Sequence, residues 1–213
     1  MTDSAESRSF DRDCRACPRL ADFLDDVKAR HPDYYCRPVP PFGDQSARLL
    51  IVGLAPGMHG ANRTGRPFTG DHAGLMLYET LHKFGFSTQR ESTTASDDLR
   101  LINARITNAV KCLPPDNKPI GAEINTCNAY LANELGGLAD GSVVVALGGI
   151  AHRAILRALG RRQVEFKFGH EAMHDLGGLW LLDSYHCSRY NTNTGRLTAD
   201  MFEAVFAKAR SLL

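Results

Sequence analysis

Four cysteines in this sequence have the residue type and spacing of a metal site. Cys14 and Cys17 form a C-x-x-C pair followed by proline, whereas Cys112 and Cys127 stand singly much farther along the chain. Four thiolates can hold an iron–sulfur cluster or a zinc ion. Structural zinc usually takes two short C-x-x-C pairs, so this spacing fits a [4Fe–4S] cluster better, with unligated buried thiols as a further alternative. We expect reduced, partly buried thiols at the other two cysteines, Cys36 and Cys187.

A glycine-rich segment, residues 53–74, is the second place with potential for chemistry. An apolar run, 49–52, precedes it, and an amphipathic run follows from about Leu75. Glycines let the backbone approach a ligand closely. Backbone N–H groups together with Arg63 and Arg66 would suit a phosphate. The segment matches neither the dinucleotide-binding motif nor a P-loop, and a tight strand-to-helix connection with solvated arginines would look the same.

The elements that must position these residues alternate between strands and helices. Apolar and alternating runs predict strands at 48–53, 101–110, 142–147 and 179–182. Amphipathic runs predict helices at about 20–31, 72–84, 122–135, 150–159 and 198–213, the last capped by Thr198. Loops are predicted at 36–47, 87–98, 161–178 and 184–196. This order predicts an α/β fold with a central four-stranded parallel sheet flanked by helices, whose ligands bind beyond the carboxyl ends of the strands.

Length and composition narrow the class of protein. A chain of 213 residues suits a single domain over 1–213, with the segment of Cys14 and Cys17 contributing to the metal site. The formal net charge of +1 gives no global field for a polyanion, so nucleic-acid binding would depend on local patches. Residues 1–9 are predicted to be a frayed polar leader. No run has the length of a membrane span or the pattern of a signal peptide, so we expect no membrane partner, a cytoplasmic location, reduced cysteines and a monomer.

Three strings in the sequence resemble one known family. They are GLAPGMHGANRTGRPFTGD, TNAVKCLPPDNKP and SYHCSRYNTNTGRLT. These strings, their order and the cysteine placement are similar to those of the type-b (family five) uracil-DNA glycosylases, iron–sulfur members of the uracil-DNA glycosylase superfamily. The resemblance runs from Cys14 to about Thr198. It implies a four-stranded parallel sheet between helices, a [4Fe–4S] cluster held by Cys14, Cys17, Cys112 and Cys127, and excision of uracil and of deaminated purines such as hypoxanthine and xanthine from DNA.

The resemblance also implies a pocket for a base that has left the duplex stack. Gly53 and Ala55 would lie against the base, and Phe68 would stack on it. Asn108 would read the O4 and N3–H edge of uracil, and His186 would donate a hydrogen bond to O2 as charge develops there. Each residue also has an ordinary structural interpretation, because a buried phenylalanine, a strand-end asparagine and an interior histidine are common.

The group that directs the attacking water is less clear from the sequence. Many superfamily members carry Asp or Asn where this chain has Ala55, so another residue must act or the group is weak. Asp71 is the nearest carboxylate to the glycine-rich loop, and its competing role is N-cap of the next helix. Asn191 is a further catalytic candidate in the segment after His186. Cys187 also departs from the family pattern, where an apolar residue or proline is expected.

Candidate DNA contacts gather in two segments. His59, Asn62, Arg63 and Arg66 lie in the glycine-rich loop, and Arg189 and Tyr190 lie after His186, where either side chain could fill the gap left by the base. Three arginines at helical spacing are predicted mainly to form a solvated face, with DNA contact as the alternative: Arg153, Arg157 and Arg161. Further positive charge lies near the cysteine loops at Arg105, Lys111 and Lys118.

The sequence thus predicts a monofunctional DNA glycosylase with DNA as its partner and a [4Fe–4S] cluster of structural role. A protein that binds damaged DNA with little turnover is one alternative, because Ala55 replaces the usual water-directing residue. An iron–sulfur electron-transfer protein is another, but that function would leave Asn108 and His186 without a role.

Overall fold

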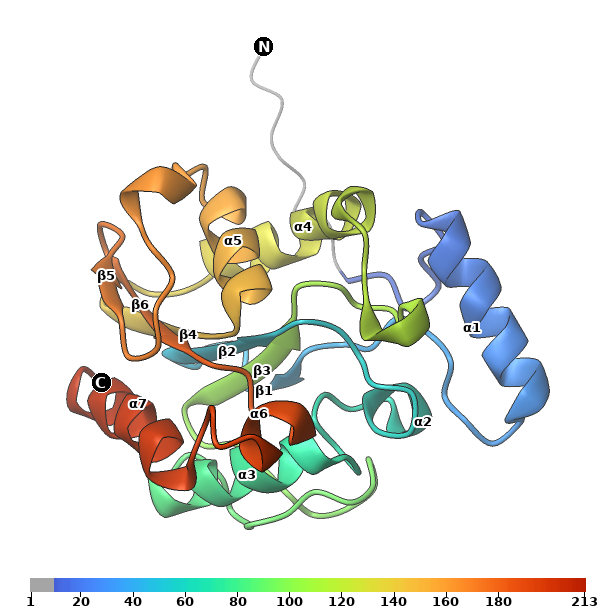
Figure 1. Cartoon of the computed structure of the whole chain (residues 1–213), viewed down its shortest axis with the longest axis horizontal. Helices are drawn as coiled ribbons and strands as arrows, with labels where there is room; N and C mark the ends of the chain where they lie inside the picture. Colours follow the sequence, from blue (N-terminus) through green and yellow to red (C-terminus); the bar gives the residue numbers. More distant parts are fainter. Residues whose placement is uncertain (1–9) are drawn as a thin grey trace.

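A six-stranded sheet forms the centre of the molecule (Figure 1). The computed structural model describes residues 10–213, and the leader expected at 1–9 lies outside them. The strand order is β1-β3-β2-β4-β6-β5. The four inner strands run parallel: β3 (Ala104–Asn108), β2 (Leu49–Gly53), β4 (Ser142–Leu147) and β6 (Leu179–Ser184). The predicted α/β class with a parallel centre is therefore confirmed.

The sequence predicts four strands, and the structure adds two short strands at the edges of the sheet. Strand β1 (Phe42–Gly43) pairs antiparallel with β3, and β5 (Met173–Asp175) pairs antiparallel with β6. Both lie in segments predicted as loops. They are too short to show a period-two pattern, and β5 faces solvent at Met173 and Asp175. Their backbone pairing covers the edges of the parallel sheet.

Helices cover both faces of the sheet (Figure 1). Helices α3 (His72–Lys83) and α7 (Ala199–Ser211) lie on one face, and α4 (Gly121–Gly136) and α5 (Gly149–Ala158) lie on the other. Helix α1 (Pro18–Arg30) lies to one side, beyond α2 (Ala61–Thr64). The short elements are the helix α6 (Arg189–Asn193) and the 3-10 turns η1 (Pro115–Asn117) and η2 (Gln163–Glu165).

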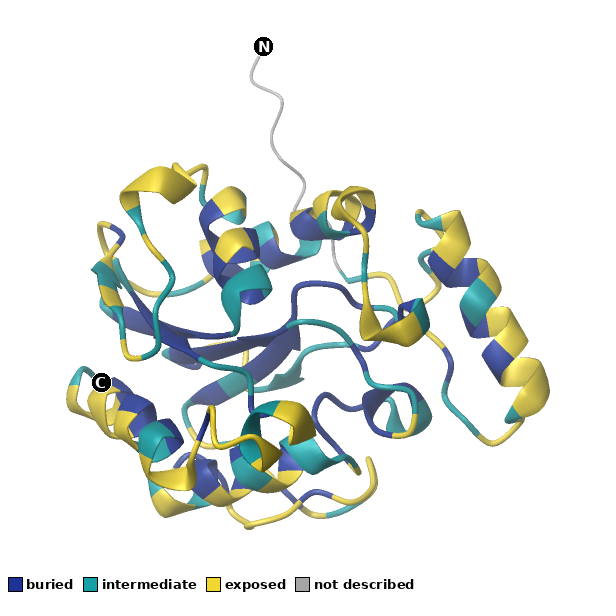
Figure 2. Ribbon diagram, in the orientation of Figure 1, coloured by how far each residue is buried: buried dark blue, intermediate teal, exposed yellow. Residues whose placement is uncertain are grey.

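Alternation along the strands produces two apolar cores, one on each face of the sheet (Figure 2). In β2, Leu49 and Ile51 pack in the core that includes α3 and α7, whereas Leu50 and Val52 pack in the core that includes α4 and α5. All five residues of β2 are buried, as expected for a strand covered on both faces.

Parallel pairing aligns the strand ends that carry the predicted site. Gly53, the last residue of β2, is the register partner of Asn108, the last residue of β3. Strand β6 ends at Ser184, two residues before His186. Three predicted site segments therefore leave the same edge of the sheet. In the described part of the chain, no helix combines the length and the apolar character needed to cross a membrane.

Candidate active site

A cavity of about 420 Å³ opens at the carboxyl edge of the parallel strands. Its walls come from the loops after β2, β3, β4 and β6. The structure brings five predicted residues together in these walls: Ala55, Phe68, Asp71, Asn108 and His186. Gly53 lies directly behind them. A Cβ on Gly53 would stand 2.4 Å from Asn108 Oδ1 and 2.6 Å from Phe68 Cζ, so only glycine allows both side chains to approach the strand end.

Phe68 holds a strained backbone conformation at the base of this cavity. Its φ is 52°, in the left-handed region that costs a non-glycine residue about 1–3 kcal/mol. Gly74 permits this conformation, because a Cβ there would lie 1.8 Å from the Phe68 carbonyl oxygen. The ring of Phe68 is stacked loosely against that of His186, with centroids 6.0 Å apart and planes inclined by 28°. The two rings form one continuous aromatic wall.

Asn108 presents an unpaired acceptor to the site. Its side chain is 4% exposed, and its Oδ1 has no hydrogen-bond partner within residues 10–213. A buried amide oxygen without a donor costs about 1–3 kcal/mol. Because Asn108 lines the cavity, a ligand with an N–H group could satisfy this oxygen.

His186 is a neutral imidazole at physiological pH. Burial lowers its pKa to about 4, although part of the ring is open to the cavity. The loop that carries it is fixed by Asn191, whose Nδ2 donates to the His186 carbonyl oxygen at 2.8 Å. Asn191 thus supports the loop and does not line the cavity. A neutral ring can donate through one nitrogen, with no net charge to desolvate.

Asp71 is both a helix cap and a residue of the cavity wall. Its Oδ1 accepts from the Gly74 N–H at 2.8 Å, which makes it the N-cap of α3, and the residue also lines the cavity. Its Oδ2 lies beside Gly60, where a Cβ would stand 2.2 Å from that oxygen. Burial raises the pKa of Asp71, against the backbone N–H groups of Gly74 and Ala73, which lower it.

Two predicted DNA contacts are instead occupied inside the protein. Arg66 is 7% exposed, forms an ion pair with Asp97 and donates to the Ala95 carbonyl at 2.6 Å. Asn62 is fully buried and donates to Cys36 Sγ at 3.4 Å. The interpretation of these two side chains as DNA contacts does not fit their positions. The partners Asp97 and Cys36 are remote in sequence, so nothing local indicated the pairing.

The other predicted contacts lie nearer the surface. His59 Nδ1 is 2.8 Å from the Tyr34 hydroxyl, and Arg63 Nε donates to the His59 carbonyl at 2.7 Å. Arg189 and Tyr190 begin α6, and Tyr190 is 72% exposed. An aromatic side chain so exposed, next to the cavity loop of His186, is free to enter a partner.

The cavity also contains residues that sequence reasoning did not single out. Asn117 and Ser188 line it. Asn117 adopts a left-handed backbone with φ 55°, in the turn of the Pro-Pro-Asp-Asn segment. That turn composition was a usable signal for an ordered loop, though not for a cavity wall.

Four cysteines from three separate elements converge on a second cavity, of about 120 Å³. They come from the segment leading into α1, the loop after β3 and helix α4, and they are the predicted set: Cys14, Cys17, Cys112 and Cys127. Burial, with a smaller contribution from the other three thiols, raises the pKa of Cys112 to about 12. Within residues 10–213, no three of these sulfurs lie within 4.8 Å of one another. Tetrahedral zinc with bonds of about 2.3 Å needs thiolates roughly 3.8 Å apart, closer than this arrangement provides.

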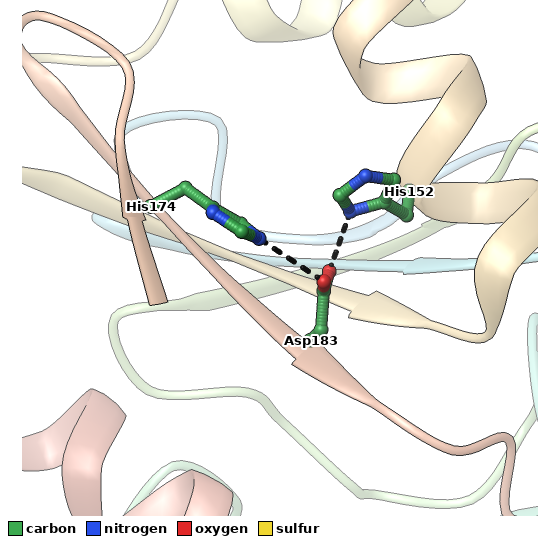
Figure 3. Close-up of side chains that lie close together, drawn as sticks. All are labelled: His152, His174 and Asp183. Atoms are coloured by element: carbon green, nitrogen blue, oxygen red, sulfur yellow. Dashed lines mark hydrogen bonds and ion pairs between the residues drawn. The ribbon is translucent and has the colours of Figure 1, made fainter. Parts of the chain in front are cut away.

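A third polar cluster, His152, His174 and Asp183, was not singled out in the sequence (Figure 3). His152 Nδ1 lies 2.8 Å from Asp183 Oδ1, and His174 Nε2 lies 3.3 Å from Asp183 Oδ2. The second ring nitrogen of His152 lies 3.0 Å from the Phe166 carbonyl, which can only accept, so that nitrogen carries a proton. The ligating atoms lie within 4.8 Å of one another, as a metal site requires. However, they already bind one another, so the cluster is complete as a hydrogen-bonded brace.

Comparison with known proteins shows the family to which the chain belongs. Residues 40–210 match the family model described as the Uracil DNA glycosylase superfamily. The chain is 49% identical over 205 residues to the type-5 uracil-DNA glycosylase of Thermus thermophilus, with 93% of each chain covered. It is 44% identical to the type-5 enzyme of Mycobacterium bovis, covering 93% of this chain and 78% of that one. It is 41% identical to that of Pyrobaculum aerophilum, covering 92% and 87%. The chain belongs to the type-5 uracil-DNA glycosylases, and the predicted resemblance is confirmed.

Proposed function

We propose that this chain is a monofunctional DNA glycosylase that hydrolyses the N-glycosidic bond of uracil, and of deaminated purines, after the nucleotide has turned out of the duplex. The observation that carries this proposal is the unpaired, buried Oδ1 of Asn108 in a cavity walled by Phe68 and His186. Hydrolysis without a covalent enzyme intermediate is consistent with the cavity walls, which include no lysine within residues 10–213.

Asn108 discriminates against cytosine and adenine. Its Oδ1 accepts a hydrogen bond from a ring N–H, and its amide can donate to a neighbouring carbonyl. Uracil, hypoxanthine and xanthine each carry a ring N–H beside a carbonyl. Cytosine and adenine carry a bare ring nitrogen beside an amino group, which would leave Oδ1 unpaired and place two acceptors together. A cavity of about 420 Å³ has room for a purine as well as a pyrimidine.

His186 and Asp71 serve the bond-breaking step. When the C1′–N bond breaks, its electron pair passes to the base and negative charge develops on the uracil O2. The neutral His186 ring donates a hydrogen bond to that oxygen. A water adds to C1′, leaving a hydroxyl on the sugar, and its proton neutralises the departing base. Asp71, as a carboxylate, stabilises the cationic sugar or orients this water in place of a group at Ala55.

The segment after His186 holds the DNA open. Tyr190 would enter the gap left by the extruded nucleotide, and Arg189 beside it would contact phosphate. His59 and Arg63 are the remaining surface candidates for the opposite rim. Asn191 contributes by fixing the carbonyl of His186.

The four converging cysteines would hold a [4Fe–4S] cluster. Their convergence on one cavity and their wide mutual spacing suit a cluster better than a single ion. The cluster would tie α1, the loop after β3 and α4 together, and that loop begins directly after Asn108. A structural role is favoured, because Asn108 and His186 already account for the chemistry.

A base-release assay tests the proposed activity. Duplexes with one uracil, hypoxanthine, xanthine, cytosine or adenine are incubated with the holoprotein and then cleaved with alkali. We expect strand breaks at the first three bases only. Tight binding of the uracil duplex without breaks would instead favour the alternative of a damage-binding protein.

A spectroscopic comparison tests the cluster separately. The holoprotein purified without oxygen should be brown, with broad visible absorption and about four irons per chain. Cys112→Ser should lose this absorption, and Cys36→Ser, which alters a buried thiol outside the cavity, should retain it. A colourless preparation containing zinc would overturn the assignment.

A further inference from the structure

A third cavity, called the hollow below, adjoins the base cavity and has no role in the proposed chemistry. It measures about 290 Å³ and lies between α4 and α5, which run side by side on one face of the sheet (Figure 1). Ile150 lines both this hollow and the base cavity, so the two share a wall. Among residues 10–213, the lining contains Arg153 and Arg157 and no carboxylate.

The positive charges of Arg153 and Arg157 are not paired within the described part of the chain. Both are exposed, and neither guanidinium has a hydrogen-bond or ion-pair partner in the described part of the chain. Arg161, predicted to share their helix face, is different: its guanidinium donates to the Leu176 carbonyl, away from the hollow. Two of the three arginines predicted to share a helix face therefore line the hollow, and the third is held by a hydrogen bond within the protein.

The position of this pair is unfavourable for the isolated helix. Like charges four residues apart on a helix repel by a few tenths of a kcal/mol. Arg153 also folds toward the positive end of α5, where its Nη1 lies 3.3 Å from the point at which a Gly149 Cβ would stand. The first turn of α5 has no acidic residue to offset this charge. The same arrangement becomes favourable when an anion lies in the hollow.

We infer that this hollow binds a backbone phosphate of the DNA strand that carries the extruded nucleotide. The inference rests on the proposed function, since it takes DNA as the ligand. Continuity with the base cavity through Ile150 favours that strand over a free anion. Arg153 and Arg157 grip the phosphate, and the amides of Asn125 and Gln163 add donors at the rim. Such a contact positions the nucleotide and carries no base information.

Salt-dependent binding tests the subsite. Affinity for a uracil duplex is measured from low to moderate salt for the holoprotein and for Arg153→Gln/Arg157→Gln. Loss of one phosphate contact should make the slope of log affinity against log salt shallower by about 0.9 and weaken binding about tenfold. Arg100→Gln, which removes an exposed charge from the loop after α3, is the matched control and should keep the original slope.

Neutral phosphate analogues locate the contact. Methylphosphonates are placed one at a time around the uracil. At one position the analogue should weaken the unmodified protein and leave the double variant unaffected. If every position affects both proteins equally, or the double variant matches Arg100→Gln, the subsite is wrong. Failure of the unmodified protein to release uracil would instead overturn the proposed function.

Discussion

The base cavity and the His152–His174–Asp183 cluster both include residues on or just after β6. They differ in that the buried polar atoms of the cluster are hydrogen-bonded, whereas the cavity contains one that is not. In the cluster, each carboxylate oxygen of Asp183 faces a histidine nitrogen, and Oδ2 also accepts from the Gly169 N–H at 3.3 Å. In the cavity, Asn108 Oδ1 has no partner among residues 10–213, Phe68 is strained, and His186 lines the open space. Satisfied polar groups stabilise the fold, whereas the unpaired oxygen of Asn108 is retained at a cost and, because it faces a cavity, can be satisfied by a ligand.

The largest effect is expected when the carboxylate is removed from the hydrogen-bonded His152–His174–Asp183 cluster. Asp183→Ala removes the acceptor shared by the buried His152 and the partly buried His174, and we expect the free energy of unfolding of the holoprotein to fall by about 3–5 kcal/mol. Urea denaturation measures the change. Asp175→Ala is the control: this exposed carboxylate accepts only from the nearby Gly177 N–H, so its loss should cost about 1 kcal/mol or less. A loss of under 1 kcal/mol for Asp183→Ala would show that the cluster is not a brace.

The next effect concerns catalysis in the cavity. His186→Ala removes the donor to the developing charge on the base, and the single-turnover rate of uracil release should fall about 10²- to 10³-fold. Binding of the uracil duplex should change by less than about threefold, because the backbone contacts dominate affinity. Rates within a factor of two of the original would remove His186 from the chemistry.

The sequence could predict those parts of this site that are local. The residue types of Asp71 and Thr198 predicted the caps at which α3 and α7 begin. The apolar runs and the family strings predicted the parallel centre of the sheet. They also predicted the edge at which Phe68, Asn108 and His186 meet, because parallel strand ends must lie together. The convergence of four distant cysteines was predicted by spacing and resemblance, and the structure places them around one cavity.

The parts that escaped depend on partners far apart in the sequence. Arg66 was interpreted as a DNA contact because its loop is basic, but Asp97, 31 residues later, neutralises it. His152 and Asp183 likewise meet only because α5 packs on the sheet that contains β6. The edge strands β1 and β5 have two and three residues, too few for any periodic pattern. Side-chain pairing across elements has no local signal, so it requires the folded structure.

A pH comparison gives a smaller effect. The folded pKa of His186, about 4, lies below the unfolded value of about 6.5. Between these values the unfolded chain binds a proton that the native protein does not, so stability falls as pH falls through this window. From pH 7 to pH 5 the unmodified protein should lose roughly 1–2 kcal/mol more than His186→Gln, with allowance for the open side of the ring. Equal losses in urea titrations of both proteins would show that the ring charges freely in the native state.

The smallest effect contrasts two buried asparagines directly. Asn128 is 7% exposed and its Nδ2 donates to the Ala154 carbonyl at 2.9 Å, whereas Asn108 is 4% exposed with an unpaired Oδ1. Asn128→Ala should lower the free energy of unfolding by about 1 kcal/mol, because it removes a buried hydrogen bond. Asn108→Ala removes an unsatisfied atom, so stability should be unchanged or rise by up to about 1 kcal/mol while uracil release slows. Equal destabilisation by both substitutions, measured by urea denaturation, would mean that Asn108 stabilises the fold. Its oxygen would then not be an acceptor kept unpaired for the base.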